Sequence, residues 1–206
     1  MRKPIFSGEL EEKELPTSGL LSFDKSSFKD QDISSSEIEE VRFEQCKFEN
    51  ITFNQTKIEE SKVTDCVFNK CNFAGTKFEE AYFSRVEFQS SRMQGFQADA
   101  GKLQDVYFKS CKPQSANFRF SKLKEVVFEE CDLSDADFVG AELENVIFKV
   151  CNLNNAEFSQ SQLKNVKLNG SNIENIHIAS DSFRGVTVDT NQALYLTSIF
   201  GLTVED

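Results

Sequence analysis

Three near copies, KLQDVYFKSC at residues 102–111, KLKEVVFEEC at 122–131 and ELENVIFKVC at 142–151, follow one another at intervals of 20 residues. The same interval extends beyond these copies, because a valine recurs at every twentieth position from Val86 to Val186. A fixed period of this length is typical of a repeat architecture, in which each unit packs on its neighbours along the chain.

Within each copy the large apolar residues are five positions apart, and this spacing runs without a break from Phe23 to Val188. The positions in this frame hold 17 of the 21 phenylalanines and no charged residue. The residue two places earlier is usually small, and all six cysteines occupy such places. A period of five stays on one face of neither a helix nor a strand. Units too short to bury their own apolar side chains must therefore stack into a solenoid.

Four five-residue units fill the 20-residue period, which predicts a coil with four sides. Successive coils would pair as parallel strands about 4.8 Å apart, giving a rod about 40 Å long. The segments CDLSDADFVGAELENVIF (131–148) and CNLNNAEFSQSQL (151–163) resemble the A(D/N)LXX consensus of pentapeptide-repeat proteins. The resemblance implies an all-β fold, the right-handed quadrilateral β-helix.

The frame divides the chain into three segments. Residues 1–20 lie outside it and are expected to form an irregular N-terminal cap over the open end of the solenoid. The β-helix itself is expected over 21–189. In 190–206 the apolar residues move to helical spacing, which predicts a short C-terminal helix from Gln192 that ends before Gly201.

One stretch, SRMQGFQADAG at 91–101, is weak within the frame. Met93 and Ala98 are poor central residues, while Phe96 and Gly101 replace the usual small inward residues. We therefore expect a bulge or a modest surface loop here.

The C-terminal segment carries a second resemblance. RGVTVDTNQALYLTSIFGLTVE at 184–205 is similar to the end of Qnr-type quinolone-resistance proteins, with Gly185, Val186, Gln192 and Gly201 in matching places. In that family, and in its mycobacterial relative MfpA, this end forms a homodimer. The resemblance thus implies dimerisation through the apolar helix residues, namely Ala193, Leu196, Ile199 and Phe200.

The composition offers little for catalysis. The chain has one histidine, His177, no tryptophan, no phosphate-binding glycine motif and no nucleophile beside a plausible base. We expect no enzyme activity, no cofactor and no metal site. The N-terminus lacks a signal-peptide pattern and no apolar run could span a bilayer, so a cytoplasmic location is expected. There the cysteines would stay reduced and serve as small core residues.

Charge is unevenly distributed around the predicted coil, and the chain has a net charge of −11. The side centred on positions 38, 58, 78 and onward carries ten acidic residues against the three bases Lys57, Lys77 and Arg119. We name this side the acidic face. Its acidic residues are Glu37, Glu39, Glu40, Glu59, Glu60, Glu79, Glu80, Asp99, Asp137 and Glu157.

Such a face repels nucleic acid and attracts basic surfaces. Together with the Qnr-like tail, it favours a rod that mimics DNA and binds DNA gyrase or topoisomerase IV, protecting the enzyme from quinolones or modulating it. The resemblance implies that the acidic face would be the partner-binding surface. The alternative is a scaffold or interaction solenoid with another partner, or a soluble rod whose acidic face meets only water. No face has the basic groove with aromatics that nucleic-acid binding needs, and no membrane partner is expected.

Overall fold

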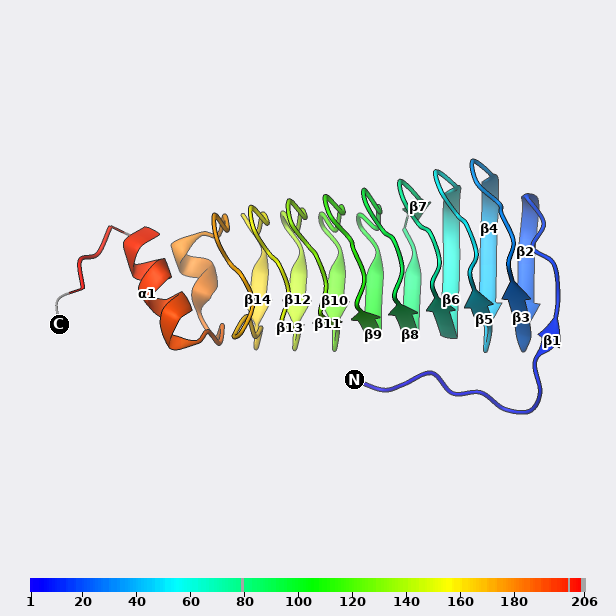
Figure 1. The fold of residues 1–206 in the computed structure, drawn as a ribbon, viewed down its shortest axis with the longest axis horizontal. Helices are drawn as coiled ribbons and strands as arrows, with labels where there is room; N and C mark the ends of the chain where they lie inside the picture. Colours follow the sequence, from blue (N-terminus) through cyan, green and yellow to red (C-terminus); the bar gives the residue numbers. More distant parts are fainter. Residues whose placement is uncertain (79, 200, 205–206) are drawn as a thin grey trace.

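The computed structural model describes residues 1–78, 80–199 and 201–204, and its chain winds into a tapering rod of parallel strands (Figure 1). The short strands each lie on one side of a coil, whereas the longer ones continue around a corner onto the next side, and strands of successive coils pair with one another. The strands are β1 (Glu11–Glu12), β2 (Ser18–Asp24), β3 (Ser26–Lys29), β4 (Glu37–Glu44), β5 (Lys47–Glu49), β6 (Lys57–Asn69), β7 (Lys77–Phe78), β8 (Tyr82–Gln89), β9 (Lys102–Lys109), β10 (Lys122–Lys124), β11 (Val127–Glu129), β12 (Glu142–Glu144), β13 (Ile147–Lys149) and β14 (Gln162–Lys164).

The strand register follows the 20-residue period. Leu123 pairs with Leu103 on one side and with Leu143 on the other, in parallel. Single bridges such as Asn152 with Asn172 keep the same offset where no strand is formed. The predicted fold, a right-handed quadrilateral β-helix, is therefore confirmed, and residues 20 apart lie one above the other on the same side.

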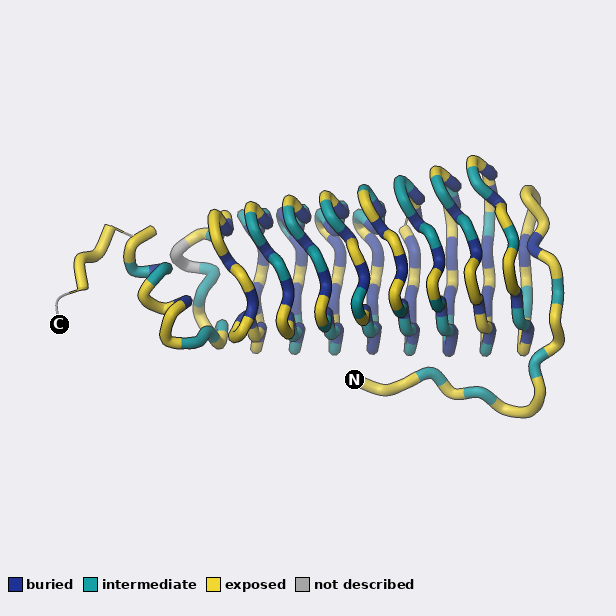
Figure 2. Tube along the Cα trace, viewed as in Figure 1, coloured by how far each residue is buried: buried dark blue, intermediate teal, exposed yellow. Residues whose placement is uncertain are grey.

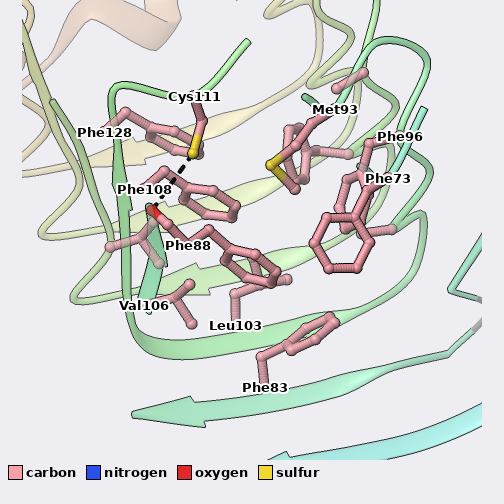
Figure 3. Packing of buried hydrophobic residues seen from close by; sticks show 14 of the residues in the cluster. Phe73, Phe83, Phe88, Met93, Phe96, Leu103, Val106, Phe108, Cys111 and Phe128 are labelled. Atoms are coloured by element: carbon pink, nitrogen blue, oxygen red, sulfur yellow. Dashed lines mark hydrogen bonds between the residues drawn. The ribbon is translucent and has the colours of Figure 1, made fainter. Parts of the chain in front are cut away.

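Stacked phenylalanines fill the interior of the rod. The Phe108 and Phe128 rings are nearly parallel, with centroids 4.6 Å apart, and Figure 3 shows them in one column with Phe88. Phe138, from the opposite side of the coil, meets Phe128 edge-on at 81°. Offset-stacked and edge-to-face geometries are the favoured arrangements of aromatic pairs. Because these rings point inward, buried and exposed positions alternate along the coils (Figure 2).

The six cysteines are free and buried, as predicted. Each thiol approaches main-chain carbonyl oxygens; the Cys111 Sγ, for example, lies 3.4 Å from the Phe88 oxygen (Figure 3). Burial raises the pKa of the Cys71 thiol to about 12. A thiol held protonated in this way is a poor nucleophile. All six buried cysteines fill small core positions, with each thiol near a main-chain oxygen.

The prediction of a bulge or loop at 91–101 is wrong. Met93 and Ala98 are fully buried, and Arg92 and Gln97 pair in register with the coils on both sides. The reason is an exchange of size between neighbouring positions: Phe96 fills the volume that the small central residue Ala98 leaves. Its ring lies 5.6 Å from that of Phe78.

Two short helices close the C-terminal end. The 3₁₀-helix η1 (Ser180–Phe183) is followed by α1 (Thr190–Ile199), which begins two residues earlier than predicted. Gln192 and Leu196 form the buried side of α1. Figure 1 shows α1 lying across the end of the rod, in orange-red.

The N-terminal residues take a course that the sequence did not reveal. Residues 1–10 leave β1 and run back beside the rod, so that the N-terminus lies near its middle (Figure 1). Leu15 is buried in the core, whereas Leu20 is 71 % exposed.

Candidate partner-binding surfaces

The acidic face begins on β4 and continues on β6 and β7. Ile38, Ile58 and Phe78 point inward and are buried, so the residues on either side of each point outward. The parallel register places Glu40 directly opposite Glu60. Like charges at such a position are destabilising, and this arrangement is a direct consequence of the 20-residue period.

Cations compensate only part of this charge. Arg42 lies 3.2 Å from Glu40, and Lys57 lies 2.8 Å from Glu59. Within residues 1–78, 80–199 and 201–204, the remaining described acids at this end of the face make no ion pair; they are Glu37, Glu39, Glu60 and Glu80. Glu79 lies outside the described residues. The first three coils of the acidic face therefore carry a net negative field.

Further along the rod the acidic face changes character. Asp137 is paired with Arg119 at 2.8 Å, and Glu157 lies 3.0 Å from the His177 Nδ1. Burial would raise the pKa of Glu157, but hydrogen bonds from Ser159 and His177 outweigh it and lower the pKa. Asp99 is half-buried. The ten predicted acids thus separate into a cluster of largely uncompensated charges near β4–β7 and a second group that includes two ion-paired acids.

A basic column borders the acidic cluster. Arg42 pairs in register with Lys62, and Lys102 with Lys122 further along, all on the side next to the acidic face. A shallow hollow of about 340 Å³ opens at the other edge of the cluster, lined by Glu37, Glu39 and Glu59 among others. The surface is therefore polar and open, with a charge that changes along the rod rather than an enclosed site.

The predicted dimerisation residues do not share one free face of α1. Leu196 is buried against the rod of its own chain, whereas Ala193 and Ile199 are exposed, and Phe200 lies outside the described residues. The exposed apolar side chains that sequence analysis missed are Leu194, Leu202 and Val204. A helical-spacing argument could not separate these groups because both faces of this short helix are partly apolar.

Groupings of three or more histidine, cysteine, aspartate or glutamate side chains suited to a metal ion are absent from the described residues. Among the same residues, no helix is long and apolar enough to cross a bilayer. The geometry offers an extended, charged and regular outer surface around a packed core, as in other repeat solenoids.

Comparison with known proteins agrees with this class. The model of the "Pentapeptide repeat region" family matches residues 61–138 and 102–178, which together span more than half of the chain. The chain belongs to the pentapeptide-repeat family.

Several solved structures are similar. Full-length QnrB1, a plasmid-mediated fluoroquinolone resistance protein, is 18 % identical with a TM-score of 0.43, over 86 % of this chain and 100 % of that one. HetL, a protein involved in heterocyst differentiation regulation from Nostoc sp. strain PCC 7120, is 9 % identical with a TM-score of 0.39, over 82 % and 87 %. A protein of the Arabidopsis thaliana thylakoid lumen is 16 % identical with a TM-score of 0.42, over 62 % and 75 %. No curated protein matches the sequence.

Proposed function

We propose that this protein is a non-enzymatic binding rod that presents its acidic face to the basic DNA-binding surface of DNA gyrase or topoisomerase IV. Occupying that surface in place of DNA, it would protect the enzyme from quinolones or modulate its activity. The similarity of residues 184–205 to the end of Qnr-type proteins motivates the choice of partner.

The opposition of Glu40 and Glu60 is the observation that carries the proposal. Two glutamates on strands about 4.8 Å apart repeat a negative charge along the rod at a spacing fixed by strand pairing. The fold accepts a destabilising pair here, and the neighbouring Glu37 and Glu39 add to the same field. Such a field favours association with a basic surface and makes the association depend on ionic strength.

The proposal includes a homodimer at the C-terminal end. Leu194, Ile199, Leu202 and Val204 are between 43 % and 62 % exposed and lie close together in the sequence. A second copy placed on this end would remove these side chains from water and double the length of the acidic rod.

DNA supercoiling by gyrase, with this protein titrated in, tests the proposal. In the presence of ciprofloxacin, the protein should restore supercoiling; in its absence, the protein should inhibit supercoiling. Either result supports the proposal. The variant Glu39→Lys/Glu40→Lys/Glu59→Lys/Glu60→Lys should weaken either effect about tenfold or more, because juxtaposed like charges cost several kcal/mol in an interface.

A matched control reverses the charge of four exposed acids elsewhere, at Glu9, Glu14, Glu49 and Glu174. This variant should keep the effect of the native protein. The proposal fails if native protein leaves gyrase and topoisomerase IV from its own source unaffected, or if the acidic-face and control variants behave alike. A scaffold with another partner would then be the better description.

A further inference from the structure

The N-terminal segment lies along one corner of the rod, one side away from the acidic face. The residues at this corner follow the 20-residue period, and we name them the corner column: Gln45, Asp65, Arg85, Asp105 and Glu125. All five adopt the left-handed conformation, with φ between 52° and 57°, and this conformation turns each side chain outward beside the segment. Residues 1–7 cross these coils in an extended course (Figure 1).

Three backbone amides of the segment donate to three acceptors of the corner column. The Ser7 nitrogen lies 2.7 Å from the Gln45 Oε1, and the Ile5 nitrogen lies 2.9 Å from the Asp65 Oδ1. The Arg2 nitrogen lies 2.7 Å from the Asp105 Oδ1. The corner column therefore holds an extended chain mainly by its main-chain donors, so most of the contact depends little on which side chains the chain carries.

Charge adds selectivity at one end. The Arg2 guanidinium lies 3.0 Å and 2.9 Å from the Asp105 Oδ2 through its Nε and a terminal nitrogen. The Met1 nitrogen lies 3.1 Å from the Glu125 Oε2. Asp105 is itself buried, at 3 % exposure. Asp65, at 5 % exposure, is already paired with Arg85 at 2.6 Å and offers the segment only a hydrogen-bond acceptor. A buried carboxylate such as Asp105 that faces a basic segment favours it over a neutral or acidic one.

Little apolar surface holds the segment in place. Ile5 is 63 % exposed and Arg2 has a side chain that is 68 % exposed. Phe6 makes the most distinctive side-chain contact, with the Lys47 Nζ 4.7 Å from its ring centre. Segments with few buried apolar contacts open at low free-energy cost, and exposed ion pairs weaken with salt.

We propose that residues 1–7 form a displaceable strap and that the corner column is a binding site for extended basic peptide segments. The strap occupies this site within its own chain, and a basic segment of a partner competes with it. The site differs from the acidic face, so the inference does not depend on a topoisomerase being the partner.

The chain has no tryptophan, so Phe6→Trp gives a single fluorescent reporter of the strap in the full-length protein. Tryptophan strengthens rather than removes the contact with Lys47, because its ring binds cations best. We expect a high emission anisotropy at low salt that falls as NaCl is raised. Adding Arg2→Glu should lower the anisotropy at 150 mM NaCl, because it places a carboxylate against Asp105.

Lys3→Glu is the matched control. It makes the same change in charge at an exposed position whose side chain makes no hydrogen bond or ion pair within the described part of the chain. We expect the fall in anisotropy caused by Lys3→Glu to be at least threefold smaller than that caused by Arg2→Glu. The reason is that exposed unpaired charges contribute little at this ionic strength.

The binding site is tested with the Arg2→Glu chain and a labelled peptide of residues 1–10. This peptide should bind at least tenfold more tightly than the same peptide with Arg2 and Lys3 replaced by glutamate. Equal binding of the two peptides would overturn the proposal. An anisotropy that Arg2→Glu leaves at the native value would overturn it as well.

Discussion

Asp189 and Gln192 are joined by two hydrogen bonds across the first turn of α1. The Gln192 nitrogen donates to the Asp189 Oδ1 at 3.0 Å, and the Asp189 nitrogen donates to the Gln192 Oε1 at 2.9 Å. This reciprocal pair is a capping box, which satisfies two main-chain donors at the start of a helix. The Gln192 amide then reaches the Leu168 and Ser171 oxygens at 2.8 Å and 2.7 Å, joining the cap to the last coil.

Replacing Gln192 should therefore loosen the end of the rod. Gln192→Ala removes half of the cap and leaves the buried Leu168 and Ser171 oxygens without this donor, so we expect a loss of about 2–3 kcal/mol. Asn191→Ala, at the neighbouring exposed position, should cost less than about 0.5 kcal/mol. Urea unfolding gives both values. Equal stabilities of the two variants would contradict this role for Gln192.

Acid should release the same cap. Hydrogen bonds from the Gln192 and Gly170 backbone nitrogens lower the pKa of Asp189. A lowered pKa means that the stabilisation is fully present above the unfolded-state value of about 3.9 and is lost as pH falls through the lower native value. A ¹³C titration of the Asp189 carboxyl should show a midpoint below the unfolded-state value of about 3.9. In Asp189→Asn, the stability of α1 should depend less on pH below about pH 4 than it does in the native protein. A native-like pH dependence in this variant would contradict the role of Asp189 in the cap.

Val150 occupies a conformation that does not suit it. It has φ of 54° and is 62 % exposed, so its branched side chain gains little burial in return for left-handed strain. Val150→Asn should raise the free energy of unfolding by about 1 kcal/mol, because asparagine tolerates this region. Val67→Asn is the control, since Val67 lies in extended β6 and should lose stability on the same change. Thermal unfolding distinguishes the two; destabilisation by Val150→Asn would refute the strain argument.

The exchange of size between Phe96 and Ala98 predicts a coupled response. Phe96→Ala should cost about 3–5 kcal/mol by leaving a cavity, whereas Phe120→Ala, at a ring that is 59 % exposed, should cost far less. Adding Ala98→Phe to Phe96→Ala should recover part of the loss, because the ring returns to the usual central position. Strictly additive effects in this double-mutant cycle would contradict the exchange.

The sequence predicted the coil well because its signal is repeated many times. Each phenylalanine column supplies the same evidence for the same register, and strand pairing then follows for every outward residue, including Glu40 and Glu60. The stretch at 91–101 misled the prediction because it was judged position by position. Packing fills a volume, and Phe96 compensates for Ala98 through space.

The ends were harder because their signals occur once. Nothing in residues 1–7 has a repeat to compare with, and their partners Gln45, Asp65 and Asp105 lie up to 103 residues away. The corner column recurs at 20-residue intervals, but its role depends on where the N-terminal segment runs. At the other end, Leu196 and Leu194 have similar chemistry, and only the docking of α1 decides which of them is covered.

The uninterrupted 20-residue register makes the rod tolerant of some length changes and sensitive to others. Gaining or losing 20 residues adds or removes one whole coil, changes the length by about 4.8 Å and leaves every column aligned. Gaining five residues would preserve the core frame yet turn all later coils by a quarter of a revolution. Glutamates, corner residues and cap would then face new directions, so a lineage that conserves a surface of this kind can change its length only in whole coils.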